Sequence, residues 1–84
     1  MPKHNHTFVE NYSDLVGFGL DRNTDEKTII YYLQKFSDDE LMHTIVPRMN
    51  DAELADIFDR ISALMSKYLS EKEYHRYFLK DEHH

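Results

Sequence analysis

The stretch that decides the fold is MNDAELADIFDRISALMSKYLSEKEY, residues 49–74. Its apolar residues recur every three or four positions, which is the spacing of one face of an α-helix. Asn50 followed by Glu53 is a capping box, in which a side chain and a backbone N–H pair reciprocally at a helix start. The stretch therefore predicts a long helix over about 51–69, whose apolar stripe consists of Leu54, Ile57, Phe58, Ile61, Leu64, Met65 and Tyr68.

A second capping box, Ser70 followed by Glu73, lies inside the same stretch. At about 100° per residue, an unbroken helix would carry Tyr74, Tyr77 and Phe78 on the side opposite the apolar stripe. A break near Ser70 removes this conflict, and we favour it because the box falls at that position. The alternative is one long helix whose far end offers its aromatic side chains to a partner.

The same start signal occurs three more times toward the N-terminus, at Thr7, Asn23 and Ser37, each with Glu three residues later. The first signal predicts a helix that runs to Val16, with Gly17 as the left-handed residue just past its end. The others predict helices over about 24–36 and 38–46. The last of these should stop before Pro47, because the residue before proline is disfavoured in helical geometry.

These signals predict an all-α fold, a small compact bundle of four to five helices in which the helix over about 51–69 is the longest. We expect a single domain over residues 1–84, with frayed tails at 1–6 and 81–84. The helix over about 24–36 should bury Ile29, Ile30, Leu33 and one of the two adjacent tyrosines, Tyr31 and Tyr32.

Size limits how much core this chain can build. A chain of 84 residues can hide only about 64% of the surface that it exposes when unfolded. It has no cysteine, so no disulfide can supplement the core. Stability must therefore come from packing, from helix capping or from self-association.

Targeting signals are weak in this sequence. Residues 1–6 are polar and lack the apolar segment of a secretory signal, and no apolar run approaches the roughly 18 residues of a membrane span. We therefore expect a cytoplasmic protein without a membrane span. His83 and His84 stand outside the functional argument, since a purification tag has the same composition.

Charge is unevenly distributed along the chain, whose net charge is −6. Residues 37–59 hold seven acidic residues and one basic residue, whereas residues 60–80 hold five basic and two acidic residues. Helix dipoles explain part of this pattern, because they favour acids in a first turn and bases in a last turn. The remainder points to association with a second copy or with a charged partner.

The last predicted helix is the candidate interaction site. Lys72, Arg76 and Lys80 follow one another at intervals of four and form a basic stripe. The aromatic residues Tyr74, Tyr77 and Phe78 occupy the opposite side of such a helix. The interpretation without a binding function is an ordinary amphipathic helix that packs its aromatic residues against the core. The functional interpretation is a surface that binds an acidic partner, a phosphate or a membrane surface.

Catalytic and metal-binding motifs are missing from the sequence, and we predict neither an enzyme nor a cofactor or metal site. There is no cysteine, no phosphate-binding glycine loop and no Gly-x-Ser-x-Gly motif. The opening of a calcium loop at Asp21, Asn23 and Asp25 fails further on, because Glu26 and Tyr32 occupy its diagnostic glycine and glutamate positions.

Protein recognition is the function class that remains. Eleven aromatic residues, six Tyr and five Phe, are a generous share for a small domain, and tyrosine suits half-buried contact surfaces. The sequence thus predicts a non-enzymatic interaction or regulatory module that self-associates as a homodimer. The alternative is a DNA-linked transcriptional regulator that uses the basic last helix. Direct DNA binding is disfavoured elsewhere, because the helix from Asp51 begins with acidic residues that repel phosphate.

Overall fold

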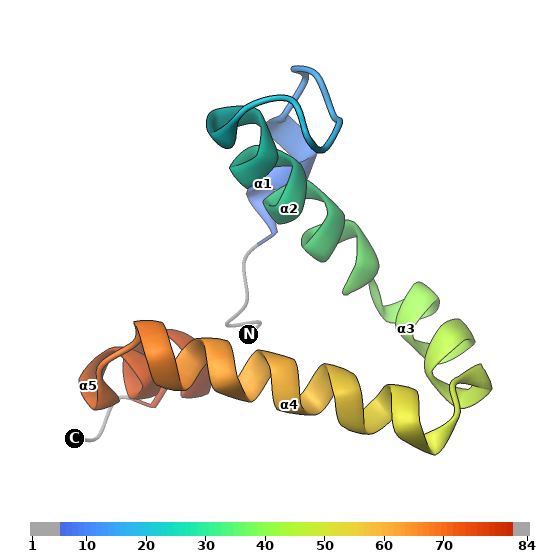
Figure 1. Ribbon diagram of the computed structural model, residues 1–84, viewed down its shortest axis with the longest axis vertical. Helices are drawn as coiled ribbons and strands as arrows, with labels where there is room; N and C mark the ends of the chain where they lie inside the picture. Colours follow the sequence, from blue (N-terminus) through green and yellow to red (C-terminus); the bar gives the residue numbers. More distant parts are fainter. Residues whose placement is uncertain (1–5, 82–84) are drawn as a thin grey trace. The chain divides into compact units, whose positions relative to one another are not determined.

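The computed structural model describes residues 6–81, and these residues contain five α-helices, one 3₁₀-helix and one π-helix (Figure 1). In chain order the elements are α1 (Thr7–Asn11), α2 (Arg22–Phe36), α3 (Asp39–Ile45), η1 (Val46–Arg48), α4 (Asp51–Tyr68), α5 (Glu71–Glu73) and η2 (Tyr74–Leu79). The predicted all-α class with four to five helices is confirmed. The longest helix is α4, with 18 residues, as predicted.

The chain divides into two compact units, Met1–Pro47 and Arg48–His84, and each is described by itself. The single domain over 1–84 stays a prediction. Of the tails expected to fray, residues 1–5 and 82–84 lie outside the described residues. His6 and Asp81 are both held: His6 Nε2 lies 3.0 Å from Ser37 Oγ, and the Asp81 N–H donates to the carbonyl of His75 over 2.9 Å.

Two helices are capped by aspartates, whereas the sequence pattern predicted other residues as their caps. Asp21 accepts a hydrogen bond from the Thr24 N–H at the start of α2, and Asp38 accepts one from the Leu41 N–H at the start of α3. The cap predicted at Asn23 is therefore wrong by two residues, and the cap predicted at Ser37 is wrong by one residue. Aspartate at these positions competes successfully because its carboxylate also favours the positive end of the helix dipole.

The first helix is shorter than predicted. It ends at Asn11, and Tyr12 is already extended, so the expected run to Val16 is wrong. Thr7 is its first helical residue, and the residue before it makes no side-chain capping hydrogen bond. Instead, Gln34 Oε1 of α2 accepts a hydrogen bond from the Val9 N–H over 3.0 Å, which satisfies one donor of the first turn from outside the helix.

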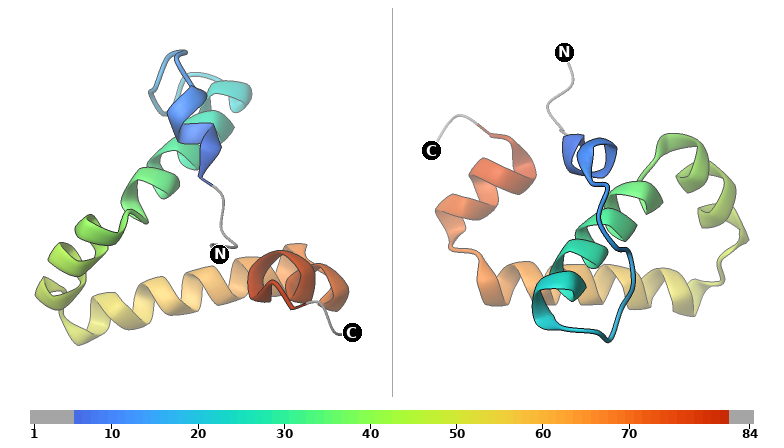
Figure 2. Two further views of the ribbon diagram at one scale, coloured as in Figure 1. Left: turned by 180° about the vertical axis from the view of Figure 1, so that it is seen from behind. Right: turned by 90° about the horizontal axis from the view of Figure 1, so that it is seen from above.

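A loop over residues 12–21 folds back along α2, and α1 lies beside the same helix (Figure 2). Thr28 Oγ1 both accepts from the Gly17 N–H (3.1 Å) and donates to the Gly17 carbonyl (2.9 Å). The left-handed glycine is Gly19, with φ of 94°, which corrects the prediction for Gly17. Partial burial raises the pKa of Tyr12, and the carboxylates of Asp14 and Asp21 raise it further.

Pro47 does not end α3 in the way that the sequence suggested. Val46, the residue before it, keeps right-handed helical angles (φ −60°, ψ −44°). The chain continues as the short 3₁₀-helix η1 through Arg48, because proline removes only a backbone donor and a first turn does not need that donor.

Neither unit buries a hydrophobic side chain among the described residues, so the predicted core around α2 is wrong. Ile29, Ile30 and Leu33 all stay exposed, whereas Tyr31 is half-buried beside the ring of Tyr12. Among residues 6–81, Thr28 is the one fully buried residue. A short α1 and one loop are too little material to cover the apolar face of α2. No described helix is both long and apolar enough to cross a membrane.

Candidate interaction site

The Ser70 capping box separates the last helices from α4. Ser70 Oγ accepts from the Glu73 N–H (3.1 Å), and Glu73 Oε1 accepts from the Ser70 N–H (2.8 Å). Leu69 before the box is extended, with φ of −115° and ψ of 138°. The favoured break is therefore confirmed, and the chain changes direction sharply between α4 and α5 (Figure 2). The continuous helix is wrong.

Beyond Glu73 the backbone widens into the π-helix η2, which no local sequence pattern predicts. A π-turn closes its hydrogen bonds over five residues instead of four, so residues four apart come closer to alignment than they do in an α-helix. Tyr74 and Phe78 use this spacing. Their rings stack, with centroids 5.4 Å apart and planes 17° from parallel.

The aromatic patch that the sequence predicted divides into two parts. Tyr74 and Phe78 form the stacked pair, whereas Tyr77 lies under the guanidinium of Arg76, with Cζ 5.5 Å from the ring centroid. Tyr74 is half-buried, and both Tyr77 and Phe78 are about half exposed. Three aromatic rings are thus available on the surface of one short segment.

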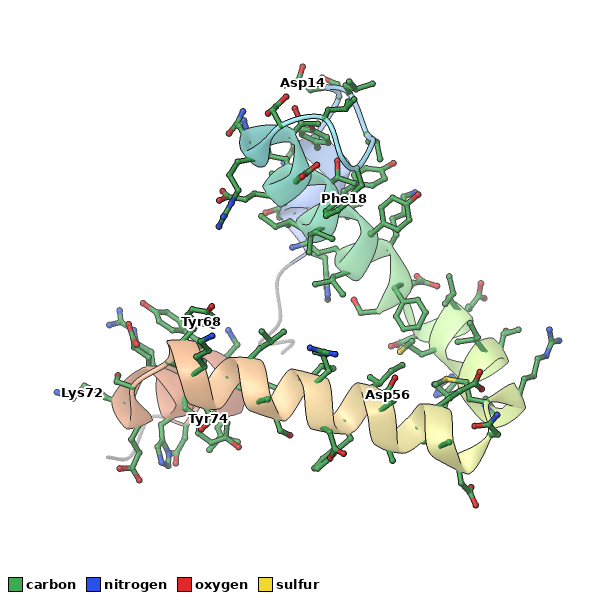
Figure 3. The ribbon with its side chains drawn as sticks, in the orientation of Figure 1. Asp14, Phe18, Asp56, Tyr68, Lys72 and Tyr74 are labelled. Atoms are coloured by element: carbon green, nitrogen blue, oxygen red, sulfur yellow. The ribbon has the colours of Figure 1, made fainter. Side chains whose placement is uncertain are left out.

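The predicted basic stripe is interrupted at its end. Lys72 is exposed on α5, and its side chain extends away from the ribbon (Figure 3). In the same view, Tyr68 and Tyr74 lie on opposite sides of the end of α4. Arg76 is exposed as well, but Lys80 is half-buried in a left-handed conformation (φ 59°) just past η2. Only Lys72 and Arg76 therefore belong to a helical face.

The histidine in this segment lies beside an aspartate just past the helix. His75 Nδ1 lies 3.4 Å from Asp81 Oδ2. The left-handed turn at Lys80 brings Asp81 back toward the helix. This contact lies at the C-terminal end of η2, and the two side chains are 32% and 37% exposed.

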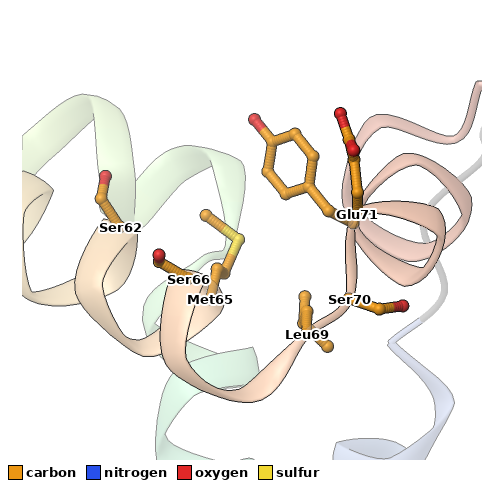
Figure 4. Close-up of a pocket in the computed structure, with 7 residues that line it drawn as sticks. Ser62, Met65, Ser66, Leu69, Ser70 and Glu71 are labelled. Atoms are coloured by element: carbon orange, nitrogen blue, oxygen red, sulfur yellow. The ribbon is translucent and has the colours of Figure 1, made fainter.

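An open cavity of about 390 Å³ lies in the elbow between α4 and α5 (Figure 4). Its apolar wall consists of Met65, Leu69 and Tyr74, and its polar rim consists of Ser62, Ser66, Ser70 and Glu71. No sequence pattern was interpreted as a sign of this cavity. The available signal was the capping box at Ser70, which ends an apolar stripe abruptly and leaves its last residues at a bend.

Neither metal ligands nor similar proteins identify a chemistry for this chain. Among residues 6–81, no three His, Asp or Glu side chains gather in a way that could hold a metal ion. Comparison with known proteins finds no matching family model, no matching curated protein and no matching solved structure.

Proposed function

We propose that this chain is a non-enzymatic protein–protein interaction module that acts by self-association. One observation carries the proposal: the described residues bury no hydrophobic side chain, while large apolar residues are exposed on α2, on α4 and on the last helices. Exposed apolar surface of this kind marks interaction sites in soluble proteins. The cytoplasmic location belongs to the same proposal.

The physical argument concerns stability. Folding must offset a conformational entropy cost of about 1–2 kcal/mol per residue, and hydrophobic burial is the main favourable contribution. Capping hydrogen bonds add about 1 kcal/mol each and cannot replace a core. A partner that covers the exposed faces supplies the missing burial. A second copy is the partner that is always present.

The candidate contact surface on the last helices consists of Tyr74, Tyr77 and Phe78 with Lys72, Arg76 and Lys80 around them. Tyrosine, phenylalanine and arginine are enriched in interface cores, and Tyr77 with Arg76 already forms a preorganised pair. Lys72, exposed at the edge, suits a polar rim that adjusts association rate more than affinity.

Sedimentation equilibrium over a wide concentration range tests the proposal. We expect the wild type to self-associate and Tyr77→Ala to associate more weakly. Glu71→Gln, on the same segment outside the aromatic patch, serves as the matched control and should follow the wild type. A wild type that stays monomeric at every concentration would exclude self-association.

A DNA-linked regulator remains the second candidate, favoured by the exposure of Lys72 and Arg76. Non-specific DNA binding depends on release of counterions and is strongest at low salt. A titration of generic duplex DNA at low salt should show binding that Lys72→Gln weakens, if this candidate is right. Absence of binding under those conditions would remove it.

A further inference from the structure

We infer that two copies of this chain pair through the apolar face of α4, with the two α4 helices antiparallel. The inference rests on the proposed self-association and names the surface and the orientation. Its starting point is a second apolar surface, separate from the aromatic patch on the last helices.

The apolar face of α4 has the spacing of a helix–helix seam. Its residues are separated alternately by three and four positions, which is the heptad spacing of knobs-into-holes packing. They are Leu54, Ile57, Ile61, Leu64 and Tyr68. The four aliphatic members are 39–49% exposed, so the unit that contains α4 does not itself cover the seam. Phe58 beside it is 70% exposed and widens the apolar surface.

The charge distribution along α4 indicates which partner covers its apolar face and in which direction the partner's helix runs. Residues 51–59 of α4 contain four acidic and no basic residues, and residues 60–68 contain two basic and no acidic residues. Two parallel copies would place the acidic halves together, and like charges across an interface are unfavourable. Two antiparallel copies place each acidic half beside a basic half and also oppose the two helix dipoles.

The other amphipathic helix of the chain offers a weaker complement. In the first half of α2 the acids Asp25 and Glu26 balance the bases Arg22 and Lys27. The second half carries Lys35 alone, so α2 offers one positive charge to the acidic start of α4 and no acidic half to its basic end. An anionic membrane surface is excluded by the acidic residues on the polar side of α4, such as Asp56 and Asp59. A second copy is the occupant that fits.

Antiparallel packing predicts which residues meet. With the seam centred near residue 59, Leu54 lies opposite Leu64 of the second copy, and Ile57 lies opposite Ile61. Glu53 and Lys67 flank the seam on the same side at its two ends, so each Glu53 comes beside a Lys67 of the other copy. This charge pair occurs twice because the arrangement has twofold symmetry.

Disulfide mapping tests the orientation, and the chain is suited to it because it contains no cysteine. Leu54→Cys and Leu64→Cys proteins are mixed in a glutathione redox buffer and the products separated. A disulfide needs Cα atoms within about 7 Å, whereas ten residues of helix span about 15 Å. We expect the mixed 54–64 disulfide to exceed both same-residue disulfides.

Ala52→Cys mixed with Ser66→Cys is the matched control. In the antiparallel pair, residue 52 of one copy lies level with residue 66 of the other, but both positions are on the side of the helix that faces away from the seam. It should form no excess of the mixed product. Excess of the 54–54 disulfide would show a parallel pair, and a statistical mixture would show that α4 is not the interface. Either result overturns this inference while leaving the proposed self-association intact.

Charge reversal gives a second, independent readout. Lys67→Glu should raise the dimer dissociation constant about fivefold at low salt, since it turns two weak attractions into repulsions. Glu53→Gln keeps the capping box. In a Glu53→Gln background the effect of Lys67→Glu should be smaller. An equal effect in both backgrounds would contradict the predicted pairing.

Discussion

Thr28 shows how a single side chain can hold a loop to a helix. Among the described residues it is the one that is fully buried, at 2% exposure. Its hydroxyl accepts a hydrogen bond from the N–H of Gly17 and donates one to the carbonyl of Gly17. Thr28→Val keeps the shape and removes both hydrogen bonds. It should lower the free energy of unfolding by about 1–3 kcal/mol, because two backbone groups lose their partner.

Urea unfolding of Thr28→Val and Thr28→Ser measures this effect. Serine keeps the hydroxyl and loses only a methyl group, so Thr28→Ser should be the milder change. A Thr28→Ser protein as unstable as Thr28→Val would mean that packing of the methyl group dominates.

Asp21 links the stability of α2 to pH. The Thr24 N–H, bound at 2.9 Å, lowers the pKa of Asp21 most, and the Thr24 hydroxyl lowers it further. A folded-state pKa below the unfolded value means that the carboxylate stabilises the fold above the unfolded pKa of about 3.9. That contribution is lost as the pH falls through the lower folded pKa.

Asp21→Asn should therefore be less stable than the wild type near neutral pH, and the difference should vanish on acidification. Thermal unfolding across the acidic range measures it. Asn23→Ala, at the position where the sequence pattern placed the cap, should follow the wild-type pH dependence. An Asp21→Asn deficit that persists in acid would contradict the role of the carboxylate.

At the scale of elements, the two capping boxes are the features that the sequence predicted most accurately. Both depend on residues three apart, so local sequence contains all the necessary information. The caps at Asn23 and Ser37 were wrong because an aspartate stood nearby and no local pattern ranks the two. The π-helix η2 and the turn at Lys80 involve contacts such as His75 with Asp81 that spacing does not encode.

Ser70 decides whether α4 stops. Ser70→Ala removes a capping box worth about 1 kcal/mol and inserts the residue with the highest helix propensity. We expect α4 to extend toward Glu73, which increases the helical signal in far-UV circular dichroism. Glu73→Gln, which keeps the box, should leave the spectrum unchanged. An unchanged spectrum for Ser70→Ala would show that the bend is set by tertiary contacts.

At the scale of the whole molecule, amphipathic patterns revealed which helix faces need to be covered and left open what covers them. The sequence predicted the apolar stripe of α4 correctly as a face, but it placed that face, like Ile29 and Ile30 of α2, in a core of the chain's own. The described residues have no buried hydrophobic side chain. The candidate site was predictable as far as its aromatic residues, while their stacking required the widened turn of η2.

Stability should consequently depend on protein concentration. If folding is completed by a second copy, mass action raises the midpoint of thermal unfolding as the chain becomes more concentrated, by about 3–6 °C per tenfold for a domain of this size. Ile61→Asp, in the middle of the α4 seam, should lower the midpoint and remove this dependence, because it buries a charge between the copies. Ala63→Asp carries the same charge on the far side of α4 and should retain the dependence. A wild-type midpoint that is constant across concentrations would mean that one chain completes its own hydrophobic burial.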